Sequence, residues 1–410
     1  MSQTTLSLEQ RVEQLEQQVA DLHQTVALLA EGQPPAAKKL QPSPKKTQTV
    51  GASEEILSWV DKTYILPRLA STSFIVVVAL ALRTSVENGL FDRELGSLLG
   101  MLYAIGLIVY GWFAYQRQNM QAPVFTLWGT IVICSVVVEA HRVFSSVPAE
   151  LAYLILAGTG AVTTIMSRTN RVALPVFSGT LGMSFGAFAI DYPSPHFPYL
   201  TLVMVLANAF GAYATSLLRA SWLRWLLLAL TLFMVQIWDL KLAIYLGKLQ
   251  PDQLEVTISG FFPAISLLFI AYIIVAFLGV RGILQKKVSK FDISLPILSI
   301  IWFTLAGTYA TRLGLAEPYL FGWLGFFGGV VMLAIGLWLL RAAPGGALGT
   351  SPFTFAGALL LLFTLPSALC HSLTANALCS LLALVVAHLA QRHGCATLRL
   401  GSYLLQVAAC

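Results

Sequence analysis

Long apolar runs separated by short polar breaks fill the chain from residue 66 onward. A helix needs about 20 mostly apolar residues to cross the roughly 30 Å hydrocarbon layer of a bilayer. Runs of this kind predict an all-α fold, a polytopic transmembrane helical bundle over residues 66–410. The twelve predicted crossings lie near residues 66–83, 95–115, 122–140, 149–167, 172–190, 198–217, 222–238, 257–280, 293–312, 318–340, 352–369 and 373–390. A last apolar stretch, Leu400 to Cys410, is too short to cross, and is either an interfacial tail or the start of a thirteenth helix.

A different apolar pattern marks residues 5–31, where valines and leucines recur at alternating spacings of four and three. This is the seam of a coiled coil, formed by Leu8, Val12, Leu15, Val19, Leu22, Val26 and Leu29. Valine at the a positions with leucine at d favours a parallel two-stranded coil, so we predict self-association. The alternative is a single amphipathic helix lying on the protein's own surface or on lipid.

Two segments connect this seam to the first crossing. Residues 32–52 contain four prolines, four lysines and no apolar run, so we predict a disordered Pro- and Lys-rich linker. Its lysines suit a position near anionic headgroups, although a merely soluble linker fits the composition equally well. Ser53 is a suitable N-cap for the residues that follow, and we predict a short interfacial helix over 53–65.

Composition agrees with a membrane protein, because 57% of the residues are hydrophobic and 11% are charged. Soluble domains have roughly 45–50% apolar residues and about a quarter charged.

The N-terminus lacks the basic region and apolar core of a secretory signal. The five cysteines form no CxxC pair and are expected to be small buried hydrophobes. The formal charge of +6 is spread through loops without a nucleic-acid-binding motif, so no nucleic acid partner is expected.

The basic residues predict an orientation. Arg281 to Lys290, RGILQKKVSK, is a dense basic cluster between two apolar runs, and the positive-inside rule assigns it to the cytoplasm. Counting crossings from there puts the N-terminus in the cytoplasm as well. Of the 25 lysines and arginines, 19 then fall on the inner side and six on the outer side, a bias that a wrong helix count would have removed.

Small residues spaced four apart predict close helix packing, since they let two backbones approach in lipid. These residues are Gly96, Gly100, Ser178, Gly182, Gly186, Gly325 and Gly329.

Polar residues at the predicted outer ends of two crossings form the candidate polar site. Ionisable groups at membrane depth are costly and often functional, although ion pairs near the interface are cheap. The candidate residues are Glu139, His141 and Arg142 at the end of the third crossing, and Gln236 and Asp239 at the end of the seventh. Asn208 and Asn376 lie deeper, where an interhelical hydrogen bond is expected.

Enzymatic and metal chemistry have weak support in the sequence. No phosphate-binding glycine loop, GxSxG elbow or HExxH helix is present. His388, His393 and Cys395 lack a carboxylate and the usual ligand spacing, so no metal or other cofactor is expected. Glu87, Asp92 and Glu94 after the first crossing are the acids that a membrane-embedded glycosyltransferase would use as base and metal ligands.

The stretch Pro67 to Gln118, with Glu87, Asn88, Gly89 and Leu90 at a turn, resembles the opening helices of a bacterial predicted membrane protein family, domain of unknown function 2339. Ala152 to Leu226 is similar to the family's next block. The resemblance implies a coiled coil and a Pro-rich linker ahead of many helices, and a place in the bacterial inner membrane. Members of the family commonly continue with further helices, so the resemblance implies either a truncation or a short form at Cys410, and it supplies no catalytic residues.

Three functional hypotheses follow. The first is a non-enzymatic membrane scaffold or assembly factor that self-associates through its coiled coil. The second is a transporter or flippase of a hydrophobic or lipid-linked substrate, acting through the candidate polar site. The third is a membrane-embedded glycosyltransferase.

Overall fold

The computed structural model describes residues 65–192, 195–218, 221–247, 260–281, 289–342, 350–369, 372–394 and 396–409. The chain divides into two compact units, residues 1–49 and 50–410, and every described residue belongs to the second. The predicted coiled coil, the linker and the interfacial helix up to residue 64 therefore lie outside the described residues.

Helices account for nearly all of the described residues, and no strand occurs among them. The helices are α3 (Ile65–Glu87), α4 (Arg93–Gln116), α5 (Ala122–Arg142), α6 (Ala149–Asn170), α7 (Leu174–Asp191), α8 (Phe197–Leu218), α9 (Ser221–Gly247), α10 (Phe261–Val280), α11 (Lys290–Arg312), α12 (Pro318–Ala342), α13 (Thr350–Ala368), α14 (Ser372–His393) and α15 (Ala396–Ala409).

Twelve of these helices, α3 to α14, are long and apolar enough to cross a membrane. Each corresponds to one predicted crossing, so the all-α class is confirmed, and the number of helices able to span a membrane agrees with the predicted number of crossings. The largest boundary error concerns α9, which was predicted to end at residue 238 and continues to Gly247. The helix continues because Trp238 and Leu242, on successive turns, are both buried against neighbouring helices.

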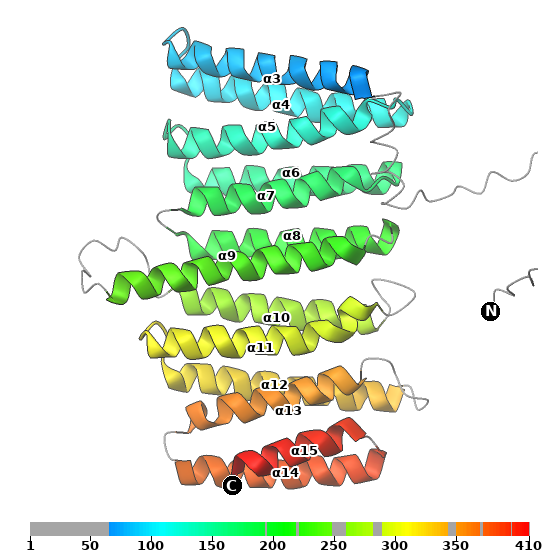
Figure 1. Ribbon diagram of the computed structural model, residues 1–410, viewed down its shortest axis with the longest axis vertical. Helices are drawn as coiled ribbons and strands as arrows, with labels where there is room; N and C mark the ends of the chain where they lie inside the picture. Colours follow the sequence, from blue (N-terminus) through cyan, green and yellow to red (C-terminus); the bar gives the residue numbers. More distant parts are fainter. Residues whose placement is uncertain are drawn as a thin grey trace, which may run out of the picture. The chain divides into compact units, whose positions relative to one another are not determined.

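The helices of this unit are arranged in two layers (Figure 1). The main packing contacts join helices that are one or two places apart in the helix order, although the successive helices α9 and α10 have little contact. The odd-numbered helices α3 to α15 therefore follow one another in one layer, and the even-numbered helices from α4 to α12 follow one another in the other. Repeat proteins have this kind of near-neighbour packing, in which almost every helix keeps one side exposed. In a membrane, that exposed side faces lipid.

Glycines let neighbouring helices approach at several of these contacts. On α12, Gly325 lies against Thr364 and Gly329 against Leu361, both on α13. On α4, Gly96 lies against Val86 of α3. A methyl group at any of these three positions would overlap its neighbour, and such close backbone approach is the main source of packing energy between helices in lipid.

The interhelical hydrogen bond expected of Asn208 is present, because its Nδ2 donates to Thr231 Oγ1 of α9 at 3.0 Å. The one expected of Asn376 is absent from the described contacts, and this residue is exposed on the surface of α14.

The last apolar stretch, for which the sequence allowed an interfacial tail or the start of a thirteenth helix, forms the helix α15. It begins at Ala396, with Leu398 and Leu405 buried in a cluster that includes Ala383 and Ala390 of α14. Gly401 lies against Ala358 of α13. The prediction started the segment four residues too late because Thr397 and Arg399 interrupt the apolar run, although the Thr397 hydroxyl lies 3.1 Å from the Thr354 hydroxyl of α13 and so joins the helix to its neighbour.

Candidate functional site

An ion pair links α3 to α5 at the end of the bundle where both helices finish. Arg83 Nη2 lies 3.2 Å from Glu139 Oε1, and Arg83 Nε donates to Glu87 Oε1 at 3.0 Å. The Arg83 side chain is 55% exposed and that of Glu139 22%. Arg83 therefore has two carboxylate partners and holds α3 against the candidate residue Glu139.

A large groove opens beside this ion pair, between α5 and α7. Its volume is about 1020 Å³. Ile131 and Phe185 are exposed on its rim, so it opens sideways, toward the surface that faces lipid in a membrane. Its lining is mostly apolar and includes Leu127, Cys134, Ser135, Val138, Phe177, Ser178, Leu181, Gly182 and Gly186. Its charged lining residues are Arg83, Glu139 and Arg142.

A second cavity of about 220 Å³ lies on the other side of Glu139, between α3, α4 and α5. The two cavities share Arg83, Ile131, Ser135 and Glu139. The Arg83–Glu139 ion pair thus stands between two mostly apolar hollows.

Small residues predicted for helix packing line both cavities. Gly182 and Gly186 of α7 lie against Cys134 of α5, and Gly186 also meets Leu156 of α6. Gly96 and Gly100 line the smaller cavity. Because Gly182 and Gly186 have no side chains, α7 approaches α5 closely beside them, while the groove stays open elsewhere along the two helices.

Other candidate residues of α5 lie at the same end. His141 Nδ1 is 2.9 Å from the Val147 carbonyl oxygen, which ties the helix end to the loop that follows. The Arg142 guanidinium lies 6.0 Å from the centre of the Tyr192 ring. Lys241 of α9 lies 4.0 Å from the centre of the same ring. Tyr192 therefore has a cation beside it from each of the two helices that contain candidate residues.

The candidate residues of α9 do not reach the groove. Gln236 is exposed on the helix surface. Asp239 is 1% exposed, and its Oδ1 has no hydrogen-bond partner among the described residues. Both were predicted at a helix end, and the structure places Asp239 two turns before the end of α9. The candidate polar site is thus divided between a groove and a buried position.

Asp191, which the sequence reasoning missed, forms the centre of a buried network near Asp239. It is 0% exposed, and its Oδ1 accepts hydrogen bonds from Tyr153 Oη at 3.1 Å and from the His196 backbone N–H. Trp238 and Lys241 of α9 are within electrostatic reach of its carboxylate. A carboxylate at the end of an apolar run, five residues before a histidine that follows a proline, was the available signal.

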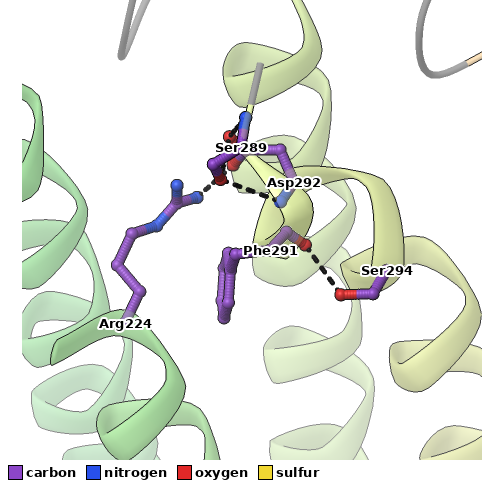
Figure 2. Close-up of polar contacts among 5 residues, drawn as sticks. All are labelled: Arg224, Ser289, Phe291, Asp292 and Ser294. Carbon is purple, nitrogen blue, oxygen red and sulfur yellow. Dashed lines mark hydrogen bonds and ion pairs between the residues drawn. The ribbon is translucent and has the colours of Figure 1, made fainter. Parts of the chain in front are cut away.

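The opposite end of the helices contains a buried ion pair between α9 and α11 (Figure 2). Arg224 Nη2 lies 2.5 Å from Asp292 Oδ1, and the two side chains are 2% and 0% exposed. Asp292 Oδ2 accepts from the Ser289 hydroxyl at 2.7 Å, within a capping box at the start of α11. The sequence analysis counted both residues on the inner side without making either a candidate, although Asp292 is the one acidic residue on that predicted side after residue 61.

The acids of the glycosyltransferase hypothesis lie around the turn between α3 and α4. Glu87, Asp92 and Glu94 are all exposed there, and Glu87 is engaged by Arg83. Within the described part of the chain, no three His, Cys, Asp or Glu side chains are grouped as a metal site requires.

Comparisons with known proteins add no relative. No protein-family model matches the chain, and neither the curated proteins nor the solved structures contain a match.

Proposed function

We propose that this polytopic membrane protein binds an amphipathic, lipid-type molecule in the groove between α5 and α7, as a transporter or flippase of a hydrophobic or lipid-linked substrate. The observation that carries the proposal is the shape of this groove, which is apolar along its length and charged at one end. An amphipathic molecule has the same division between an apolar tail and a polar head.

The groove has room for a long apolar chain. Its lining runs along α5 from Leu127 to Val143, which corresponds to about 24 Å at 1.5 Å per residue. Its sideways opening also suits a lipid, because a lipid reaches a membrane protein from within the bilayer. The two-layer packing supports this route, since near-neighbour contacts leave helix sides facing lipid rather than enclosing a central space.

The charged end supports a functional role for the groove. Burying an ionisable side chain at membrane depth costs free energy, so such a residue usually belongs to a functional site. Near the membrane interface it can instead belong to a structural ion pair. Glu139 is 22% exposed and lines both cavities. The ion pair with Arg83 therefore holds α3 against α5 and also supplies the charged end of the groove.

The test is lipid retention during purification in detergent, measured by native mass spectrometry. Ser135 is exposed and lines both cavities, so Ser135→Trp fills the space without disturbing the core. Wild-type protein is expected to retain a stoichiometric lipid that Ser135→Trp loses. Ser380→Trp is the matched control, because Ser380 is exposed on α14, outside both cavities. Equal retention in all three proteins would contradict the proposal.

A membrane scaffold is the second candidate, and the exposure of α3 favours it. In α3 only Arg68 and Ile75 are buried, while Leu66, Phe74 and Val77 are 78%, 69% and 62% exposed. The predicted coiled coil precedes this helix in the sequence, and the predicted linker and interfacial helix connect the two. If self-association is the function, Val19→Asp abolishes both dimer formation and the cellular phenotype, whereas Val19→Ile preserves them.

Two further assignments are proposals as well. Membership in the family with domain of unknown function 2339 rests on the turn at Glu87 to Leu90 and on the shared layout. Placement in a bacterial inner membrane with the N-terminus in the cytoplasm rests on the distribution of lysine and arginine.

A further inference from the structure

We infer that the ligand of the α5–α7 groove is a glycerophospholipid and that Arg142 binds its phosphate. The inference rests on the proposed function and adds the chemistry of the headgroup. It follows from the charges that line the groove and from the partners that each of them has.

Two of the three charged lining residues already satisfy one another. Arg83 contacts both Glu87 and Glu139, so its positive charge is more than balanced. Glu139 in turn has a cation beside it. Neither residue therefore offers a free positive charge to an anionic headgroup.

Arg142 differs from them. It is exposed and lines the groove, and it has no carboxylate partner among the described residues. Its described contact is the ring of Tyr192, at 6.0 Å from the centre. An arginine in this position has its planar fork of N–H groups available, and that fork matches the oxygens of a phosphate.

The position of Arg142 relative to the apolar lining suits a phospholipid in particular. The residue stands in the last turn of α5, so the apolar lining extends from it in one direction, toward Leu127. A lipid whose phosphate contacts Arg142 places its acyl chains along that lining. Basic pockets between transmembrane helices bind phospholipid headgroups in the same way.

Lipid selectivity tests the inference. Purified protein is incubated with equimolar phosphatidylglycerol and a neutral diglucosyl diacylglycerol that has the same acyl chains, and bound lipid is counted by native mass spectrometry. Because a charge-assisted hydrogen bond from Arg142 to the phosphate favours the phospholipid, we expect wild-type protein to prefer it by roughly tenfold or more. Arg142→Gln is expected to bring the ratio close to one while still binding both lipids, and Arg142→Lys to give an intermediate ratio.

Arg281→Gln is the matched control. Arg281 is also an exposed arginine at a helix end beside an aromatic ring, 5.4 Å from the centre of the Trp338 ring, and it lies outside the groove. It is expected to keep the wild-type ratio.

The outcomes separate this inference from the proposed function. A wild-type protein that binds both lipids equally, or an Arg142→Gln protein that keeps the preference, overturns the role of Arg142 and leaves groove binding intact. If wild-type protein binds neither lipid and Ser135→Trp changes nothing, the proposed function itself fails. If Arg142→Gln lowers the melting temperature and leaves the lipid ratio unchanged, Arg142 stabilises the end of α5 and does not bind the headgroup.

Discussion

Arg224 and Asp292 lie 68 positions apart in the sequence and form a fully buried ion pair that joins α9 to α11. The Arg224 guanidinium also lies 4.2 Å from the centre of the Phe291 ring, so it is enclosed by an aromatic face and a carboxylate (Figure 2). The attraction between the two charges is strong in such a medium, and so is the cost of removing them from water. The loss of one partner is therefore more damaging than the loss of both.

Asp292→Asn is expected to destabilise the protein strongly, by about 3 to 5 kcal/mol, because it leaves Arg224 as a buried cation without a counterion. Replacing both residues, as in Arg224→Met with Asp292→Leu, is expected to recover most of that loss. Chemical unfolding in detergent micelles, followed by tryptophan fluorescence, measures both effects. Lys290→Gln, an exposed charge change beside the pair, is expected to stay within about 0.5 kcal/mol of wild type. A double variant as unstable as the single one would contradict this view of the pair.

Gly279 of α10 provides the space that Asp292 occupies. A Cβ at this position would overlap the Asp292 carboxyl group, so Gly279→Ala must displace the ion pair. We expect a loss of about 1 to 3 kcal/mol, the usual cost of overpacking. Gly106→Ala in α4 is the control, since a Cβ there meets no neighbour within 4 Å and alanine suits a helix better than glycine. Thermal unfolding of the two variants should therefore shift in opposite directions, and equal shifts would argue against a steric role of Gly279.

Glu139→Gln is expected to loosen α3 without unfolding the protein. The ion pair with Arg83 is partly exposed, so its loss should cost less than about 1 kcal/mol. Hydrogen exchange of the amides near the end of α3 should become faster, because other polar contacts of this helix, made by Arg68, Thr72 and the Ile75 carbonyl, lie nearer its start. Glu150→Gln, an exposed change in the first turn of α6, should leave the exchange of α3 unchanged. Unchanged exchange in Glu139→Gln would show that the ion pair does not hold α3.

The predicted orientation has a direct test. Three crossings, α8, α9 and α10, separate Asp191 from Lys287, so tags inserted after these residues should report from opposite compartments. Alkaline phosphatase activity is expected for the tag after Asp191 and fluorescence of green fluorescent protein for the tag after Lys287. The same reporter active at both positions would mean that the number of crossings between them is even.

Part of the candidate site could be predicted from local sequence. Glu139 and Arg142 were identified because charged residues at the end of a long apolar run are conspicuous. Arg83, the partner of Glu139, was not, because the pairing joins residues 56 positions apart and depends on how α3 lies against α5. Asp191 was missed for a similar reason, since its partners Tyr153 and His196 come from two other segments.

The error at Asp239 has a physical cause. Two charged residues, Asp239 and Lys241, stand on either side of the single apolar residue Leu240, which suggests the end of a membrane span. The helix continues because burial of Trp238 and Leu242 outweighs the polarity of the residues between them. Local hydropathy does not include the neighbouring helices that make this burial available.

The sequence by itself determined the class of this protein, because bilayer thickness sets the length of each apolar run and the distribution of charges predicts a side for each loop. It determined the number of spans for the same reason. Only the tertiary structure decided that the helices form two layers, that Arg224 pairs with Asp292, and that a groove with a charged end opens beside α5. These features depend on contacts between residues distant in sequence, where the absence of one side chain, as at Gly279 or Gly182, determines which other side chain can approach.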